Sequence, residues 1–186
     1  MDGRSAASGA STSSGIVIRA AADGDLPAIA GLLNTEIAES PFVYAEHPVT
    51  VDERRLWLAE HRSKHLPVMV AVDQSSGVVS GWAALSPYRP SSGYGLTAEL
   101  SVYVDRRAQR RGIGSLLVQA LVDAAHAGGL HAIVGSVDAD NVPSTALLGR
   151  FGFVEAARLP EVGRKFGQWR TQLLVLLVLR TGDGSG

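Results

Sequence analysis

Cysteine is absent from this sequence of 186 residues. Its absence excludes disulfide bonds, cysteine nucleophiles and thiolate metal sites. A chain without disulfides fits a reducing compartment, and we expect the protein to work in the cytoplasm.

An excess of charge of one sign is also missing. The 17 Lys and Arg residues are balanced by 18 Asp and Glu residues, so no broad basic field would hold nucleic acid or an anionic membrane. The longest apolar run, residues 173–179, is much shorter than the roughly 20 residues that span a bilayer. We therefore expect a soluble protein that binds neither nucleic acid nor membrane.

Residues 1–15 contain mostly Ser, Ala and Gly and have almost nothing to bury. They predict a disordered tail, and they lack the apolar stretch of a signal peptide. No repeat or linker divides the rest of the chain. We expect one domain over residues 16–181, large enough to bury a hydrophobic core, and a flexible end at residues 182–186.

Hydrophobic spacing predicts an alternation of strands and helices. Asp23 is interpreted as a helix N-cap, and Thr50 and Glu53 have the spacing of a capping box. The predicted helices lie near residues 23–39, 50–61, 112–127 and 141–150. The predicted strands lie near residues 16–19, 68–72, 78–85, 97–105, 131–137, 153–158 and 169–180. A loop containing Lys165 to Gly167 would join the last two strands. This order predicts a single mixed α/β layer fold.

A glycine-rich turn, Gln109-Arg110-Arg111-Gly112-Ile113-Gly114-Ser115, lies between a predicted strand and a predicted helix. Glycines let the backbone approach a ligand, and the first amides of a helix point outward at the positive end of its dipole. Two arginines and a serine hydroxyl stand beside these amides and can reach phosphate oxygens. The turn therefore predicts an anion site.

Three alternatives compete for this turn. A dinucleotide fold needs a third glycine where Leu117 stands. It also needs an Asp or Glu at the end of the next strand, about 20 residues on, and the closest acid here is Asp138. A phosphate-binding P-loop needs a Gly-Lys-Ser/Thr sequence, which is absent. An ordinary turn with solvated arginines is not excluded by the turn alone.

The order of elements around the turn resembles that of GNAT-type N-acetyltransferases, over residues 16–180. The turn following Val102-Tyr103-Val104 is similar to their acetyl-CoA pyrophosphate motif. The strand Glu99-Leu100-Ser101-Val102-Tyr103-Val104, the Asp140-Asn141 turn and the segment Val162 to Trp169 resemble the phosphinothricin and methionine sulfoximine acetyltransferase branch.

This resemblance implies an α/β GNAT fold, a mixed twisted central sheet of about seven strands with helices on both faces. Acetyl-CoA, the co-substrate, would lie where the strands carrying Val104 and Val134 splay apart. The backbone of Val102, Tyr103 and Val104 would contact the acetyl and pantetheine arm. The pyrophosphate would lie on the turn, and two residues of the next helix would meet the cofactor from the other side. The turn residues are Arg110, Arg111, Gly112, Ile113, Gly114 and Ser115, and the helix residues are Asn141 and Ser144.

Glu99 is the candidate catalytic base. Strand alternation places Glu99, Ser101 and Tyr103 on one face, and a carboxylate there could take the proton of an ammonium, directly or through water. A Glu stands at this position in the phosphinothricin-type branch. The alternative is an exposed strand Glu that pairs with an arginine.

Six residues are candidates for binding the acceptor amine. In similar enzymes a basic residue stands ten before the Glu, which implies that Arg89 holds a substrate carboxylate by paired hydrogen bonds. Tyr94 and two exposed aromatic candidates of a proline-flanked loop, Phe42 and Tyr44, would wall the pocket. The resemblance implies a homodimer, in which Lys165 and Phe166 reach the partner's pocket. The alternatives are a solvated arginine, aromatic side chains that anchor loops, and an ordinary exposed loop.

The chain departs from these relatives at two positions. Leu148 stands where the related enzymes carry a His, and Gly95 stands where some place a second Arg. The acetylation machinery looks intact, and a less polar or differently shaped amine is expected. His61 and His65 have the spacing of a metal pair without a third ligand, so we interpret them as a solvated helix face and expect no metal.

These features predict direct transfer of acetyl from acetyl-CoA to the primary amine of a small amino acid or analogue. Acetylation of a protein N-terminus or lysine is one alternative, and a non-catalytic acetyl-CoA-binding module is another. A peptide would need an open groove, whereas the aromatic loop near Phe42 favours a closed pocket.

Overall fold

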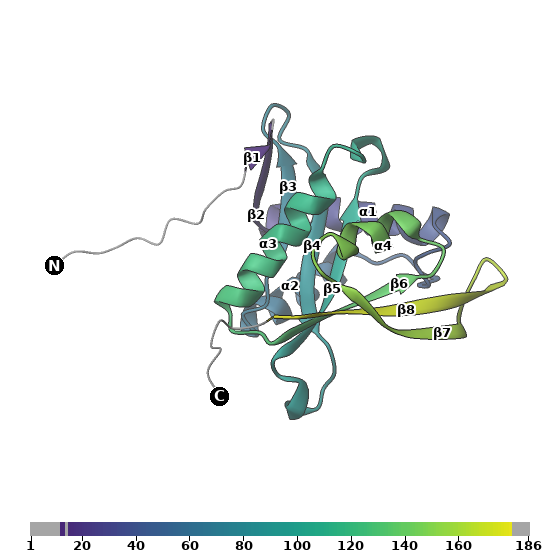
Figure 1. The fold of residues 1–186 in the computed structure, drawn as a ribbon. Coiled ribbons are helices and arrows are strands. Elements are labelled where there is room, and N and C mark those ends of the chain that lie inside the picture. Colours follow the sequence, from purple (N-terminus) through teal and green to yellow (C-terminus); the bar gives the residue numbers. More distant parts are fainter. Residues whose placement is uncertain (1–11, 14, 180–186) are drawn as a thin grey trace.

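The computed structural model describes residues 12–13 and 15–179, which form an eight-stranded sheet with helices on both faces (Figure 1). The strands are β1 (Thr12–Ser13), β2 (Ile16–Ala20), β3 (Val68–Asp73), β4 (Val79–Pro87), β5 (Thr97–Val104), β6 (Ala132–Asp138), β7 (Val154–Lys165) and β8 (Gln168–Val178). The helices are α1 (Leu26–Glu39), α2 (Val51–Ser63), α3 (Ile113–Ala127) and α4 (Val142–Gly149). Short 3-10 turns are η1 (Asp23–Asp25), η2 (Ser92–Tyr94) and η3 (Arg106–Ala108).

The predicted mixed α/β fold is confirmed, and each of the seven expected strands is present. The sheet order is β1-β2-β3-β4-β5-β6-β8-β7, in which only β5 and β6 pair in parallel. The additional strand, β1, lies inside the segment expected to be a disordered tail, and it pairs with β2. The remaining tail residues, 1–11 and 14, and residues 180–186 lie outside the described part.

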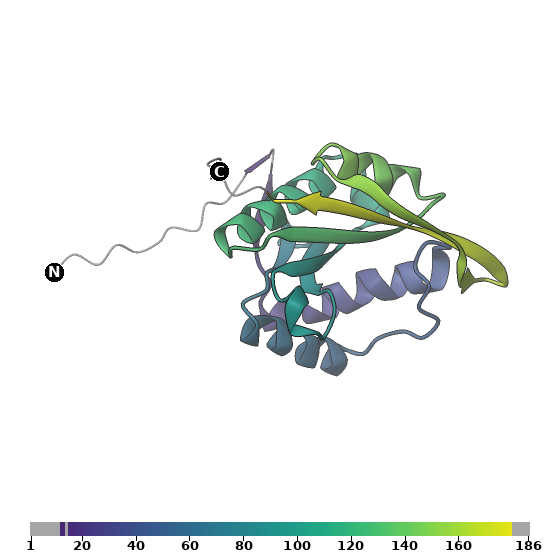
Figure 2. The same ribbon diagram turned by 60° about the horizontal axis from the view of Figure 1, so that its bottom comes forward.

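Strand alternation divides the core into two layers. Ala83 and Leu85 of β4 face α3, whereas Trp82 and Ala84 of the same strand face α1 and α2. Figure 2 shows α1 and α2 on one side of the sheet and α3 on the other. Side chains of successive strand residues point to opposite faces, so one strand supplies both layers.

The parallel pairing of β5 and β6 ends half-way along β5. Its last pair is Leu100 with Gly135. Beyond this pair β5 continues along β4 as far as Val104, while β6 continues along β8 as far as Asp138. The two strands therefore separate at their carboxyl ends, which confirms the expected splay.

The ends of the helices confirm the predicted capping box and correct the predicted N-cap. The Thr50 hydroxyl accepts the Glu53 amide and the Glu53 carboxylate accepts the Thr50 amide, which is the predicted capping box. Gly129 takes the left-handed conformation after α3, with φ of 72°. Asp23 is not the N-cap of α1. It begins the 3-10 turn η1, and α1 begins after that turn, at Leu26.

The predicted long loop between the last two strands is wrong. β7 continues to Lys165, and only Phe166 and Gly167 form the turn into β8. Both turn residues have positive φ, as a tight hairpin requires. The register of β7 against β8 shifts between Leu159 and Gly163. This bulge takes up the additional residues, so that the pairing of the two strands continues beyond it.

His61 is also corrected. It is buried rather than solvated, with Nδ1 2.7 Å from the Trp57 carbonyl oxygen and Nε2 2.9 Å from the Ser86 hydroxyl. Burial lowers the pKa of His61. Among the described residues, no helix is long and apolar enough to cross a bilayer, and no three potential metal-ligating side chains of His, Asp or Glu gather.

Candidate active site

The glycine-rich turn forms the start of α3. Arg110 and Gly112 both have positive φ, 61° and 78°, so the chain reverses sharply before the helix. The Leu116 amide is bonded to the Gly112 carbonyl oxygen, and the helical amides before Leu116 have no acceptor inside α3. The turn thus presents backbone donors beside two exposed arginines, of which Arg111 lies 3.8 Å from Asp73.

The last turn of α4 packs against the start of α3. A side chain at Gly114 would lie 3.0 Å from Leu147, so glycine permits this close approach. Asn141 is the N-cap of α4, and its side-chain oxygen accepts the Ser144 amide at 3.2 Å. Because β5 and β6 are parallel, the helices that follow them begin at the same edge of the sheet. The predicted cofactor residues are therefore brought to the edge where the strands separate.

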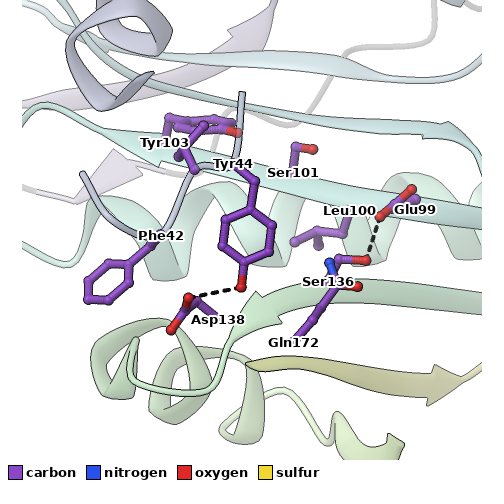
Figure 3. Close-up of a pocket in the computed structure, with 10 residues that line it drawn as sticks. Phe42, Tyr44, Glu99, Leu100, Ser101, Tyr103, Ser136, Asp138 and Gln172 are labelled. Atoms are coloured by element: carbon purple, nitrogen blue, oxygen red, sulfur yellow. Dashed lines mark hydrogen bonds between the residues drawn. The ribbon is translucent and has the colours of Figure 1, made fainter. Parts of the chain in front are cut away.

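A cavity of about 210 Å³ lies where β5 and β6 diverge (Figure 3). One wall is β5 and the other is the end of β6, while the loop between α1 and α2 crosses above them. The residues that line it are Phe42, Val43, Tyr44, Glu99, Leu100, Ser101, Tyr103, Ser136, Asp138 and Gln172. Four of the predicted residues, Glu99, Phe42, Tyr44 and Tyr103, thus share one pocket.

The Glu99 carboxylate accepts a hydrogen bond from the Ser136 hydroxyl at 2.7 Å across the gap between the strands (Figure 3). No Arg, Lys or His of the described chain forms an ion pair with it. The alternative of a strand Glu paired with an arginine is therefore wrong. Its negative charge is free to meet a substrate cation.

Asp138, the second carboxylate of the pocket, is fully engaged. Arg170 donates to both of its oxygens at 2.8 and 2.7 Å, and the Asp140 amide and the Tyr44 hydroxyl donate at 2.9 Å each. Burial alone would raise the pKa of Asp138, but these donors outweigh it and hold the pKa below its usual value. Asp138 is consequently a structural anion rather than a free base, which also argues against a ribose-binding acid.

Tyr44 closes the pocket. Its ring crosses from the loop toward β6, where the hydroxyl bonds to Asp138 (Figure 3). Burial, reinforced by the neighbouring carboxylate, raises the pKa of the Tyr44 hydroxyl, so it remains a hydrogen-bond donor. Phe42 lies under Arg170, with the guanidinium carbon 5.8 Å from its ring centre. Both aromatic residues are half-buried rather than exposed as expected.

Two predicted acceptor residues lie outside this lining. Arg89 and Tyr94 belong to the loop between β4 and β5, where the Arg89 guanidinium lies over the rings of Tyr88 and Tyr94. The loop leaves β4 at Pro87, which pairs with Ala98 beside Glu99. Arg89 therefore lies in the loop that leads into the amino end of β5 and does not line the cavity.

The resemblance implied that Lys165 reaches a partner subunit, and the structure does not bear this out. Its side chain is buried in its own chain, and the ammonium donates to the carbonyl oxygens of Ile37 and Ala45. Phe166, next to it, is exposed at the hairpin tip. Leu148 is also buried, in the core against Gly135, so α4 offers no acid at that position.

Comparison with known proteins agrees with this architecture. The model of the acetyltransferase (GNAT) family matches residues 30–153. The chain belongs to the GNAT acetyltransferase family. The resemblance predicted from the turn and the β5 sequence is thereby confirmed, and the donor of this acetyltransferase is acetyl-CoA.

Two curated relatives of this acetyltransferase match most of its length. The L-methionine sulfoximine/L-methionine sulfone acetyltransferase of Pseudomonas paraeruginosa is 36% identical, over 82% of this chain and 88% of the relative. The phosphinothricin N-acetyltransferase of Streptomyces coelicolor is 37% identical, over 83% of this chain and 91% of the relative.

Two solved structures share the fold. YncA of Salmonella typhimurium, a putative acetyltransferase solved with acetyl-CoA, has a TM-score of 0.87 and 31% identity over 93% of this chain and 99% of its own. A ribosomal-protein-alanine N-acetyltransferase of Brucella melitensis has a TM-score of 0.84 and 34% identity over 87% of this chain and 99% of its own.

Sequence analysis did not identify the polar side chains that hold the pocket of this acetyltransferase together. Ser136, Asp138 and Arg170 shape it, but none belongs to a local motif. The alternation of β6 could have placed Ser136 near the cofactor edge, because it follows Val134 by two residues. Nothing in the sequence pairs Arg170 with Asp138, which lies 32 positions earlier.

Proposed function

We propose that this enzyme acetylates the primary amine of a small amino acid or analogue, with Glu99 as the base. The observation that carries the proposal is the contrast between two carboxylates in one pocket. Asp138 is neutralised by Arg170, whereas Glu99 has only a serine donor. A substrate ammonium would find its countercharge at Glu99.

The chemistry asks little of the protein. Glu99, held by Ser136, takes a proton from the ammonium directly or through water, and the neutral amine attacks the thioester carbonyl. A thiol has a pKa of about 8.5, so the departing CoA thiolate needs no dedicated acid, which suits the buried Leu148.

Donor binding is assigned to the edge where α3 and α4 begin. The pyrophosphate would accept hydrogen bonds from the amides of Gly112 to Ser115 and from Arg110 and Arg111. The thioester arm would bond to the backbone of Val102 to Val104, because this part of β5 has a strand partner only in β4. Asn141 and Ser144 would flank the arm from α4.

The acceptor side favours a small molecule. The cavity of about 210 Å³ is below the roughly 300–1,000 Å³ of pockets that hold drug-sized ligands. Phe42 and Tyr44 would wall the amine, and the substrates named for the two curated relatives are of this size. Arg89, with Tyr94 beside it, remains our assignment for the substrate carboxylate at the mouth.

Acetylation of a protein N-terminus is the second candidate, because one similar structure is a ribosomal-protein-alanine N-acetyltransferase. The bond between Tyr44 and Asp138 joins the α1–α2 loop to β6 across the cavity, whereas an extended peptide would need an open groove. Free amino acids are therefore favoured over peptides.

A thiol-release assay with an amine panel tests the proposal. The panel contains methionine sulfoximine, phosphinothricin, free amino acids and peptides that begin with alanine. Release with the small amines and not with the peptides is expected. Release with peptides alone would favour the second candidate, and release with no amine would favour a non-catalytic acetyl-CoA-binding module.

We also propose a cytoplasmic homodimer. Acetyl-CoA is an intracellular metabolite, and Val162, Phe166 and Trp169 expose apolar side chains on the β7–β8 hairpin, which is the kind of surface that a partner covers. Phe166 would then approach the partner's pocket. Sedimentation of the native protein and of a Trp169→Ser variant tests the dimer. The variant is expected to dissociate into monomers at a higher protein concentration than the native protein does.

A further inference from the structure

The β7–β8 hairpin contacts a segment far away in sequence, the loop between α1 and α2. This loop carries Phe42 and Tyr44 across the cavity and is called the pocket roof below. Lys165, just before the hairpin turn, reaches the carbonyl oxygens of Ile37 and Ala45 on either side of the roof residues Phe42 and Tyr44. Gly163 lies directly under the Tyr44 ring, where even one additional carbon would overlap the ring.

Lys165 is held at a site that suits a buried cation. Ile37 is in the last turn of α1, where carbonyl oxygens lack helical partners and the helix dipole is negative. That turn contains no basic residue of its own. Lys165, 128 positions later in the chain, supplies the missing cation at 2.7 Å from the Ile37 oxygen. Only 4% of its surface is exposed, so these carbonyl oxygens take the place of water as hydrogen-bond acceptors.

The two ends of the roof loop are fixed separately. The Ser40 hydroxyl accepts the Phe42 amide at 3.2 Å, and the Asn34 side chain exchanges two hydrogen bonds with the backbone of Val49. Between these ends, Lys165 holds Ala45 and Asp138 holds Tyr44. The hairpin and Asp138 together thus fix the middle of the loop, which carries Tyr44 into the cavity that Glu99 lines.

We propose that the hairpin positions the acceptor site, with Lys165 and Gly163 as positioning residues that hold the Tyr44 ring in the cavity that Glu99 also lines. This role rests on the proposed function, since it assigns the roof to the acceptor amine. Loss of either contact lets the roof move and weakens acceptor binding. The acetyl-CoA cradle, formed by other elements, is left unchanged.

Lys165→Met tests the first contact, and Arg164→Met, at its exposed neighbour, is the matched control. Hydrogen exchange of residues 40–49 is expected to accelerate at least about tenfold in the first variant and to stay unchanged in the second. The KM for the acceptor is expected to rise about tenfold, the size of one lost charge-assisted bond, with the KM for acetyl-CoA unchanged. Native exchange, or an unchanged acceptor KM, in folded Lys165→Met overturns the proposal.

Gly163→Ala tests the second contact without removing a charge, and it decides the matter if Lys165→Met does not fold. Gly149→Ala is its control, because nothing lies within 4 Å of a side-chain carbon there. A selective rise in acceptor KM is expected only for Gly163→Ala, and equal values in the two variants overturn the proposal. If the native enzyme acetylates no amine, the proposed function fails, while the exchange rates still decide whether the hairpin holds the roof.

Discussion

The two sides of the cleft between β5 and β6 are built differently. Most of the donor side is continuous in sequence, because the end of β5, the turn and the start of α3 follow one another from residue 102 to residue 115, and only the start of α4 is added to them. The acceptor side gathers the α1–α2 loop, β5, β6 and the last hairpin, up to 128 positions apart. The donor side offers mostly backbone groups, whereas the acceptor side depends on side chains that hold one another.

This difference teaches where specificity can change. Backbone donors present the same groups whatever the side chain, so a donor site of this kind suits a constant co-substrate. The acceptor roof depends on individual bonds such as Tyr44 with Asp138 and Lys165 with Ala45. Substitutions on the two sides are therefore expected to separate into two kinetic classes.

Glu99→Gln is expected to produce the largest effect. Removal of a general base costs about 10²- to 10⁴-fold in rate, and glutamine keeps an oxygen for the Ser136 hydroxyl. The kcat should fall at least about 100-fold, with the KM for acetyl-CoA unchanged, as steady-state thiol release would show. Glu155→Gln, on the exposed part of β7, is the control and should retain full activity.

Asp138→Asn is expected to have the next largest effect, on stability. Breaking a buried ion pair costs about 3–5 kcal/mol, and here it also frees Tyr44. The folded-state pKa of Asp138 is lowered, so its contribution is present above the unfolded pKa of about 3.9. That contribution is lost as pH falls through the folded pKa. Urea unfolding measures the difference in free energy of unfolding between the native protein and Asp138→Asn. This difference should be complete above about pH 5 and should shrink below about pH 4. A difference that grows in acid would contradict this account.

Much of the fold follows from local pattern. The capping box at Thr50 and the glycine turn before α3 are local features, and the sequence pattern predicts both of them. The splay of β5 and β6 was implied by the family resemblance. The direction of Lys165 and the ion pair of Arg170 with Asp138 arise only when distant strands meet. The predicted exposure of His61 failed for the same reason, since Ser86 covers it from β4.

Arg111→Ala should affect only the donor side. The guanidinium is exposed and only loosely paired with Asp73, so its loss should not disturb folding. The KM for acetyl-CoA is expected to rise about five- to tenfold, as for one charge-assisted hydrogen bond, and the acceptor KM should stay constant. An equal rise in both constants would show that the two sides are not independent.

Tyr44→Phe should have the smallest effect and the opposite selectivity. It removes one hydrogen bond to Asp138, which keeps its two bonds from Arg170. Because the carboxylate keeps these donors, the loss is expected to match the net contribution of a typical hydrogen bond, about 0.5–1.5 kcal/mol, so the acceptor KM should rise about three- to tenfold. Initial rates at saturating acetyl-CoA measure it, and a change confined to the acetyl-CoA KM would place Tyr44 on the wrong side of the cleft.

The pH dependence of acceptor kcat/KM, for the native enzyme and for Glu99→Gln at saturating acetyl-CoA, tests the central claim most directly. If Glu99 takes the proton, the native rate falls on the acidic side as the carboxylate is protonated, and this limb is absent in the variant. A variant that keeps the native profile and the native rate would contradict the assignment of Glu99 as the base.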